Sequence, residues 1–153
     1  MPARARKQTG PLSLENRVFV SLLKTSDSLA QEIERILKGQ GLTATQYNVL
    51  RILRGAEPNG LACREVGDRM ISHDPDMTRL LDRMEKRRLI TRERQKEDRR
   101  VVRTRITPEG LALLKKLDEP VRSLHCQQFR HMQPARIKLL EELLDEVAAR
   151  VTK

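Results

Sequence analysis

The segment from Leu89 to Ile106 constrains the fold of this chain more than any other. Two runs of alternating apolar and polar residues flank a charged tip, Gln95 to Arg100. Alternation with a period of two is typical of half-buried strands, so these runs predict a β-hairpin. In the second run, one face carries Arg103 and Arg105, and the other face carries Val102, Thr104 and Ile106.

The residues just before this hairpin predict an amphipathic helix from Asp74 to Arg88. Asp74 is a favourable N-cap, and Pro75 suits the first helical position. One side carries the apolar Met77, Leu80, Leu81 and Met84, and the other side carries Asp76, Thr78, Arg79, Asp82, Arg83 and Lys86. A helix followed at once by a basic hairpin is the layout of a winged helix-turn-helix. In that layout the helix enters the major groove of DNA and the hairpin reaches the neighbouring minor groove.

Positive charge is concentrated in the same segment. Residues 86–105 hold ten Lys and Arg against three acids, a net +7 within a chain of formal net charge +10. Residues 134–153 hold four bases and four acids and are neutral. With one Tyr, two Phe and no Trp, the chain also lacks stacking platforms for single strands. Charge and composition therefore favour double-stranded DNA as the partner.

Helical patterns fill the rest of the chain. A long helix is expected over residues 14–38, a second after the capping-box pair Thr43 and Gln46, and a short third one over residues 62–71. After the hairpin, Thr107-Pro108 and Pro134 each begin a helix. The expected fold is mainly α with a small β-wing: a winged helix-turn-helix with six helices.

The first and last helices carry apolar stripes that a small central domain does not obviously cover. In the last helix Ile137, Leu140, Leu144, Val147 and Val151 recur at helical spacing. A second copy of the chain would bury both stripes and present two DNA-binding units on one face of a duplex. We therefore expect a flexible basic arm at 1–11, a dimerisation helix at 12–40, a DNA-binding domain at 41–107 and C-terminal dimerisation helices at 108–153.

Several ordered motifs resemble those of the multiple antibiotic resistance regulator (MarR) family. They lie between about Gly41 and Gly110 and comprise Leu42-Thr43-x-x-Gln46-x-x-Val49-Leu50, Thr78 to Glu85, Leu89-Ile90-x-Arg92, Asp98-Arg99-Arg100 and Ile106-Thr107-x-x-Gly110. The resemblance implies a homodimeric bacterial repressor that binds a pseudo-palindromic operator. It also implies that a small, often phenolic or lipophilic, effector releases the DNA.

Two positions depart from the family pattern. Arg88 stands where the family usually has Gly before the wing, so the residue best suited to a left-handed helix end is absent. The turn Asp74-Pro75-Asp76 is more acidic than the hydroxyl residues typical of the family. Because carboxylates near phosphates are unfavourable, we expect Asp76 either to accept from a cytosine amino group or to be turned aside.

The expected DNA contacts follow from this layout. Arg100 would enter the minor groove, where narrow A·T-rich segments have enhanced negative potential. Asp98 would orient its guanidinium through a hydrogen bond, and Arg99 is the second candidate for the same contact. Arg79 and Arg83 would donate to guanine in the major groove. The full set expected to contact DNA comprises Ser72, His73, Pro75, Asp76, Thr78, Arg79, Arg83, Arg94, Lys96, Asp98, Arg99, Arg100 and Arg103.

The sequence also bears on other functions. The chain has no catalytic triad order, phosphate-binding Gly-rich loop or H-E-x-x-H motif, so we expect no enzyme activity and no cofactor. His125, Cys126 and His131 fall on different helix faces, which argues against a metal site. No signal peptide or membrane span is evident, and a cytoplasmic location without membrane partners is expected. A thiol-redox regulator using Cys63, a protein–protein module and a nonspecific or architectural DNA-binding protein remain alternatives.

Overall fold

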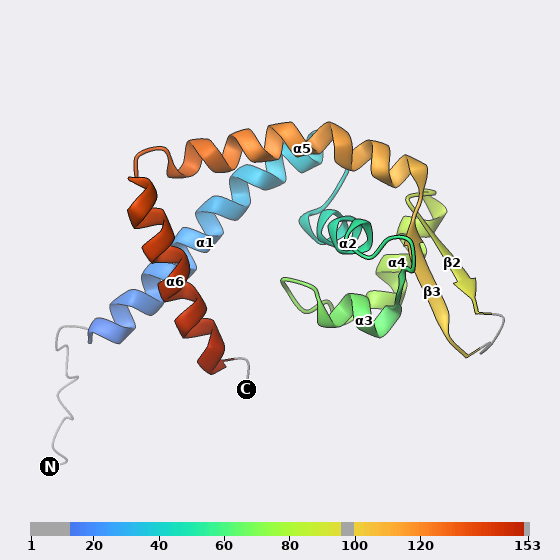
Figure 1. Ribbon diagram of the computed structural model, residues 1–153, viewed down its shortest axis with the longest axis horizontal. Helices are drawn as coiled ribbons and strands as arrows, with labels where there is room; N and C mark the ends of the chain where they lie inside the picture. The colour runs from blue at the N-terminus through green and yellow to red at the C-terminus, as the bar shows by residue number, and fades with distance from the viewer. Residues whose placement is uncertain (1–12, 96–99, 152–153) are drawn as a thin grey trace, which may run out of the picture.

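The computed structural model describes residues 13–95 and 100–151 of the 153-residue chain. These residues form six helices and a small antiparallel sheet, in the order α1 (Leu14–Gly39), α2 (Ala44–Arg54), β1 (Leu61–Ala62), α3 (Cys63–Asp68), α4 (Met77–Lys86), β2 (Ile90–Arg94), β3 (Val102–Ile106), α5 (Pro108–Phe129) and α6 (Pro134–Val151). Figure 1 shows two parts. A body of α2, α3, α4 and the hairpin lies at one end, and an arm of α1, α6 and the far half of α5 extends from it. The mainly helical winged fold expected from the sequence is confirmed.

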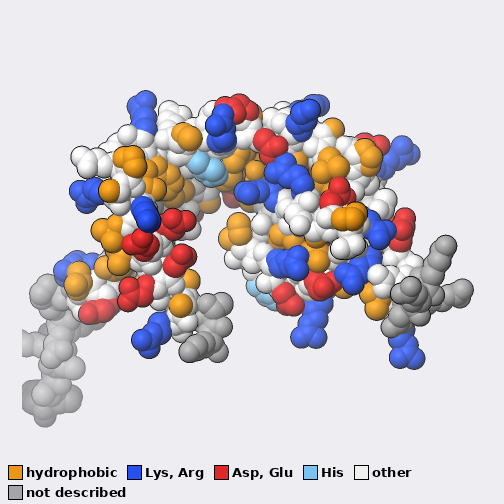
Figure 2. Space-filling model, viewed as in Figure 1, with side chains coloured by type: hydrophobic (Ala, Val, Ile, Leu, Met, Phe, Trp, Pro, Cys, Tyr) orange, Lys and Arg blue, Asp and Glu red, His pale blue; other side chains and the backbone are white. Residues whose placement is uncertain are grey.

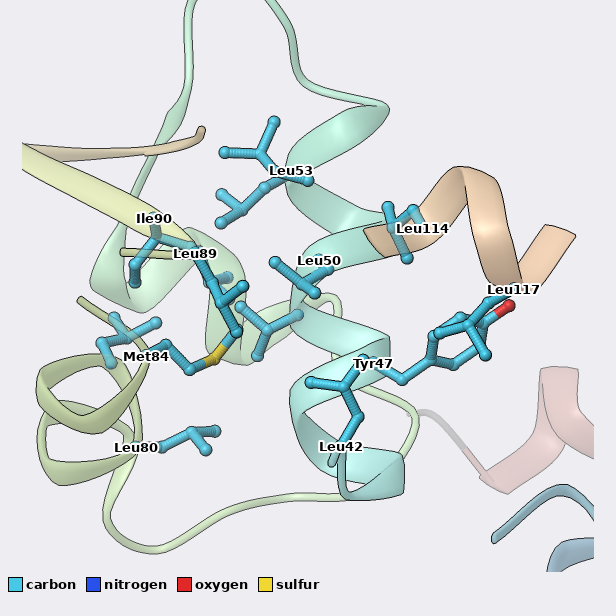
Figure 3. Close-up of a cluster of buried hydrophobic side chains, with 14 of the residues drawn as sticks. Leu42, Tyr47, Leu50, Leu53, Leu80, Met84, Leu89, Ile90, Leu114 and Leu117 are labelled. Atoms are coloured by element: carbon cyan, nitrogen blue, oxygen red, sulfur yellow. The ribbon is translucent and has the colours of Figure 1, made fainter. Parts of the chain in front are cut away.

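An aliphatic core holds the body together. Helix α2 lies at its centre, with α5 on one side and with α4 and the start of β2 on the other (Figure 3). Leu50 and Leu53 of α2, Leu81 and Met84 of α4, and Leu114 of α5 are all fully buried. Burying side chains of this size stabilises a fold by about 1.5–3 kcal/mol each. This packing fixes the orientation of α4 relative to α2 and α5.

Helix α2 begins as its sequence predicts. The Thr43 hydroxyl accepts from the Gln46 backbone N–H at 3.2 Å, and the Gln46 side chain accepts from the Thr43 N–H at 3.2 Å. The expected capping box is therefore confirmed. Leu42 and Tyr47, which flank it, are both buried.

The sheet has one strand more than the sequence predicts. Its order is β1-β3-β2, with Leu61 paired to Thr104 on one side and Arg92 paired to Thr104 on the other. The expected hairpin of β2 and β3 is confirmed. The helix predicted over 62–71 is also present, as α3, but β1 takes its first residue and the helix ends at Asp68. Two residues are too few to show a periodicity, so β1 left no signal in the sequence.

Helix α5 is joined closely to the base of the wing. The Thr107 hydroxyl caps it by accepting from the Gly110 N–H at 3.0 Å and donates to the Arg88 carbonyl at 2.7 Å. A Cβ on Gly110 would overlap the Leu89 carbonyl oxygen and lie 2.8 Å from the Ile106 side chain. Glycine is therefore required for this close approach of helix and strand.

The arm leaves much of its apolar surface uncovered. Helix α1 packs on α5, and only its C-terminal part, at Leu37, is fully buried. Along the described length of α6, no residue is buried. The large apolar side chains that remain exposed on the two helices are Leu14, Val18, Phe19, Leu23, Leu139, Leu143, Leu144, Val147 and Val151. Surface of this kind and extent on an otherwise charged protein marks an interaction site.

Candidate nucleic-acid interface

The turn that leads into α4 differs from the one predicted. Asp74 does not cap the helix: its carboxylate accepts from the Asp76 N–H at 2.8 Å and so closes the turn around Pro75. Asp76 is the N-cap, and it accepts from the Arg79 N–H at 3.1 Å. The helix therefore begins two residues later than expected, because Asp and Pro at successive positions also suit the start of a tight turn.

The N-terminal side of α4 presents several of the expected contact residues to solvent. Ser72, His73 and Pro75 are exposed in the turn, and Thr78 and Arg83 are exposed on the helix. Across the described parts of the chain, Arg83 has no ion-pair partner. Arg79 instead pairs with Asp76 at 3.2 Å.

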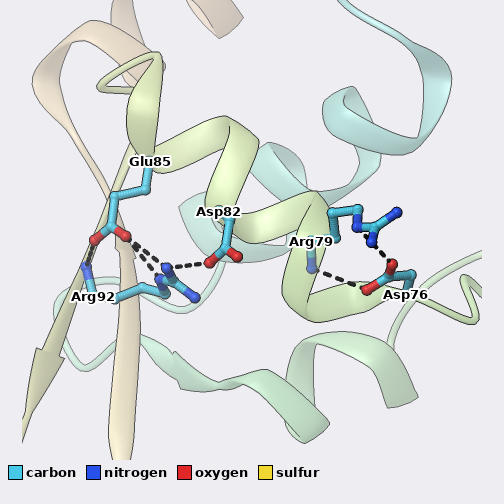
Figure 4. Close-up of polar contacts among 5 residues, drawn as sticks. All are labelled: Asp76, Arg79, Asp82, Glu85 and Arg92. Carbon is cyan, nitrogen blue, oxygen red and sulfur yellow. Dashed lines mark hydrogen bonds and ion pairs between the residues drawn. The ribbon is translucent and has the colours of Figure 1, made fainter.

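The C-terminal part of the same polar face is tied to the wing (Figure 4). The Arg92 guanidinium of β2 donates to Glu85 through Nε at 3.0 Å and through an Nη at 2.7 Å, and it also pairs with Asp82. The Arg92 backbone N–H donates to Glu85 at 3.1 Å. The hydrogen bond with Glu85 raises the pKa of Arg92 above its ordinary value, although burial partly opposes this. Arg92 thus links strand and helix.

The sequence pattern did not predict this role for Arg92. Its partners lie seven and ten residues earlier in the chain. Two acids three apart on one helix face do indicate an acceptor site for an arginine. Nothing in the spacing alone selects Arg92 over the neighbouring Arg88 or Arg94.

The wing carries the remaining expected residues. Arg94 and Arg100 are exposed on either side of the tip, and the Gln95 N–H continues the ladder by donating to the Val101 carbonyl at 3.0 Å. Arg103 is engaged within the body, since it donates to Glu65 at 3.1 Å and to the Gly60 carbonyl at 3.3 Å. Lys96, Asp98 and Arg99 lie outside the described residues, as does the expected arm at 1–11.

Arg88 takes the backbone conformation that glycine usually supplies. Its φ is 59°, in the left-handed region. The Leu89 N–H donates to the Met84 carbonyl at 3.0 Å and the Arg88 N–H to the Glu85 carbonyl at 2.8 Å, which is the paired pattern of a Schellman helix end. The end of α4 therefore has Schellman geometry although the residue in the left-handed conformation is not glycine.

The two thiols and the histidines are not assembled into a site. Cys63 is half-buried as the first residue of α3, and Cys126 is exposed on α5. No group of three or more His, Cys, Asp and Glu side chains suited to a metal ion is found over residues 13–95 and 100–151. Over the same residues, no helix combines the length and the apolar character needed to cross a bilayer.

Fold and surface together define a class of protein. Cationic side chains project from the edge of the body that carries α3, α4 and the wing (Figure 2). An exposed amphipathic helix held rigidly against a basic antiparallel hairpin is the architecture of winged helix DNA-binding proteins.

Comparisons with known proteins narrow this class. A family model described as MarR family matches residues 40–101. The repressor IacR of Pseudomonas putida is 28% identical over 133 residues, which cover 87% of this chain and 78% of IacR. A MarR transcription factor from Planctomyces limnophilus, whose crystal structure is known, is 39% identical in sequence. The alignment covers 89% of this chain and 98% of that one, with a TM-score of 0.65. The chain belongs to the MarR family of transcriptional regulators.

A more distant structure shares the fold. BpsR of Bordetella bronchiseptica, whose DNA binding is regulated by 6-hydroxynicotinic acid, has a TM-score of 0.79 at 22% identity. The alignment covers 91% of this chain and 98% of BpsR.

Proposed function

We propose that this protein is a homodimeric repressor that binds a pseudo-palindromic DNA operator and is released by a small-molecule effector. The observation that carries the proposal is the contrast between the two parts of the molecule. The body is closed around its own core and exposes a basic helix and wing, whereas the arm exposes apolar faces on α1 and α6.

The uncovered faces of the arm support a dimer. Leu143 and Val147 of α6 are each 50% exposed, and Phe19 of α1 is 61% exposed. A twofold-related copy would bury these surfaces against equivalent ones, as closed symmetric dimers do. We propose residues 12–40 and 108–153 as the dimerisation elements and residues 41–107 as the DNA-binding domain. Two such domains would then face two half-sites of an inverted repeat.

Base and backbone contacts divide between helix and wing in this proposal. Thr78, Arg79 and Arg83 on α4 would enter the major groove, and Ser72 and His73 in the preceding turn would contact phosphates or bases. Arg94 and Arg100 would follow the wing to the minor groove, together with Lys96, Asp98 and Arg99. Arg103 contributes less directly, because Glu65 and the Gly60 carbonyl already hold its guanidinium.

A groove between α1 and α5 is where we expect an effector to bind. Its volume is about 600 Å³, and its lining includes the apolar Leu29, Ile36 and Leu124 together with the charged Glu32 and Arg35. A small-ligand site needs apolar groups that bury the ligand and polar groups that orient it, and this lining supplies three of the first kind and six of the second. Binding there would change the packing of α1 on α5, and with it the spacing of the two DNA-binding domains. The ligand control of BpsR supports this part of the proposal.

Salt dependence of duplex binding tests the function. If a dimer neutralises six phosphates, its affinity should fall on the order of a thousandfold between about 50 and 200 mM salt. This affinity can be measured by fluorescence anisotropy in the presence of competitor DNA, with a labelled duplex taken from the region upstream of the protein's own gene. Affinity that does not change with salt would contradict the proposal, and equal retention of scrambled duplex would favour nonspecific binding instead.

A further inference from the structure

Asp76 and Arg79 form one structural unit at the exposed start of α4. One carboxylate oxygen of Asp76 accepts from the Arg79 backbone N–H at 3.1 Å, and the other lies 3.2 Å from the Arg79 Nε (Figure 4). The same carboxylate therefore caps the helix and holds the side chain of the residue whose N–H it accepts. Within the described residues, no hydrogen bond is formed by the two Nη groups of Arg79.

This pair contributes little to folding. Its side chains are 77% and 52% exposed, and exposed ion pairs contribute between nothing and about a fivefold change in an equilibrium constant. The pairing does restrict the rotation of the guanidinium and cancels the charge of a carboxylate that would otherwise face phosphates. Both effects favour a base contact by Arg79, since less side-chain freedom is lost on binding.

We propose that Arg79 reads a guanine in each half-site and that Asp76 is its positioning residue. This inference rests on the proposed DNA-binding function and adds a specificity to it. Guanine is the base that offers two acceptors, O6 and N7, side by side in the major groove. The two Nη groups of Arg79 match that pair, while Nε stays with Asp76. A lysine at this position would supply one point charge and no fork.

Selection from a randomised duplex library tests the proposal. The full-length wild-type chain should enrich a motif with guanine at one fixed position in each half-site. Arg79→Ala and Arg79→Lys should lose the preference at that position, by roughly tenfold to a hundredfold, and keep the rest of the motif. Asp76→Asn keeps a good N-cap but loses the charge, so it should weaken the same preference several-fold.

Two controls separate this role from a structural one. Glu119 and Arg122 of α5 form an equally exposed pair with the same three-residue spacing, at 2.7 Å. Arg122→Ala should therefore leave the motif unchanged. Replacing the selected guanine by 7-deazaguanine, which lacks the N7 acceptor, should weaken binding of the wild type and should not weaken Arg79→Ala further.

The outcomes are distinct. A guanine preference that persists in Arg79→Ala overturns the proposal. A change at a different base in Asp76→Asn overturns the positioning role, because it would mean that Asp76 contacts a base itself, as the amino group of cytosine allows. If the wild type enriches no duplex at all, the proposed function fails as well as this inference.

Discussion

Two residues in or next to the wing carry a local cost to stability, one from an unpaired hydroxyl and one from backbone strain. Thr104 lies in the central strand β3 and is fully buried, and its hydroxyl has no hydrogen-bond partner in the described parts of the chain. A buried hydroxyl without a partner costs about 1–3 kcal/mol. Its cross-strand partners are Leu61 on β1 and Arg92 on β2, and Val102 and Ile106 share its face of β3, so the site suits a β-branched apolar residue.

Thr104→Val should therefore stabilise the protein by about 1 kcal/mol. Urea unfolding followed by circular dichroism measures the change. Thr91, which is exposed on the neighbouring strand β2, provides the control, because Thr91→Val removes a solvated hydroxyl and should have little effect. Destabilisation by Thr104→Val would mean that the hydroxyl is satisfied in solution.

Arg88 carries a backbone cost of a different kind. Its φ of 59° is unfavourable for a residue with a Cβ, by about 1–2 kcal/mol. Arg88→Gly should stabilise the protein by about 1 kcal/mol, less than the full cost because glycine also loses more freedom on folding. Thermal unfolding of Arg88→Gly and Arg88→Ala separates the two effects. Equal stability of these two variants would contradict the account.

At the scale of elements, the joint between α4 and the wing matters most. Arg92 joins β2 to Asp82 and Glu85 on α4, so helix and hairpin are held in one fixed arrangement. In the proposed complex, α4 and the wing lie in adjacent grooves. The angle between them then sets whether both contact DNA at once.

Arg92→Met should lower stability by about 1–2 kcal/mol and weaken duplex binding more than the loss of one charge explains. Methionine keeps the apolar stem, whereas Asp82 and Glu85 lose their partner and add negative charge near the phosphates. The backbone amide of residue 92 donates to Glu85 in the wild type, so its hydrogen exchange should also become faster in this variant. If binding falls only as much as in Arg122→Met, wing and helix are not coupled through Arg92.

Elements that depend on residues close together in the sequence were predicted better than those that depend on tertiary packing. The capping box of α2, the hairpin and the cap of α5 were predicted correctly, because each depends on residues within a few positions. The start of α4 was misplaced, because Asp74 and Asp76 are equally good caps by type and only the geometry of the turn chooses between them. The partner of Arg92 and the strand β1 depend on tertiary packing, so the sequence pattern alone did not show them.

At the scale of the whole molecule, the account depends on a second copy. The core of the body also includes Leu37 at the end of α1 and Leu114 in the first half of α5, whereas much of the apolar surface of α1 and α6 stays exposed. A charged substitution at the exposed Leu143 adds no strain within one chain and would disrupt a symmetric apolar contact. Leu143→Glu should therefore leave the fold of the body intact and abolish association of the arms.

The mass of the complex with a duplex, measured by native mass spectrometry, tests this central claim most directly. The wild type should bind a duplex carrying the selected inverted repeat as two chains per duplex. Leu143→Glu should bind it far more weakly, as single chains. A wild-type complex of one chain per duplex, at an affinity that Leu143→Glu matches, would contradict the account.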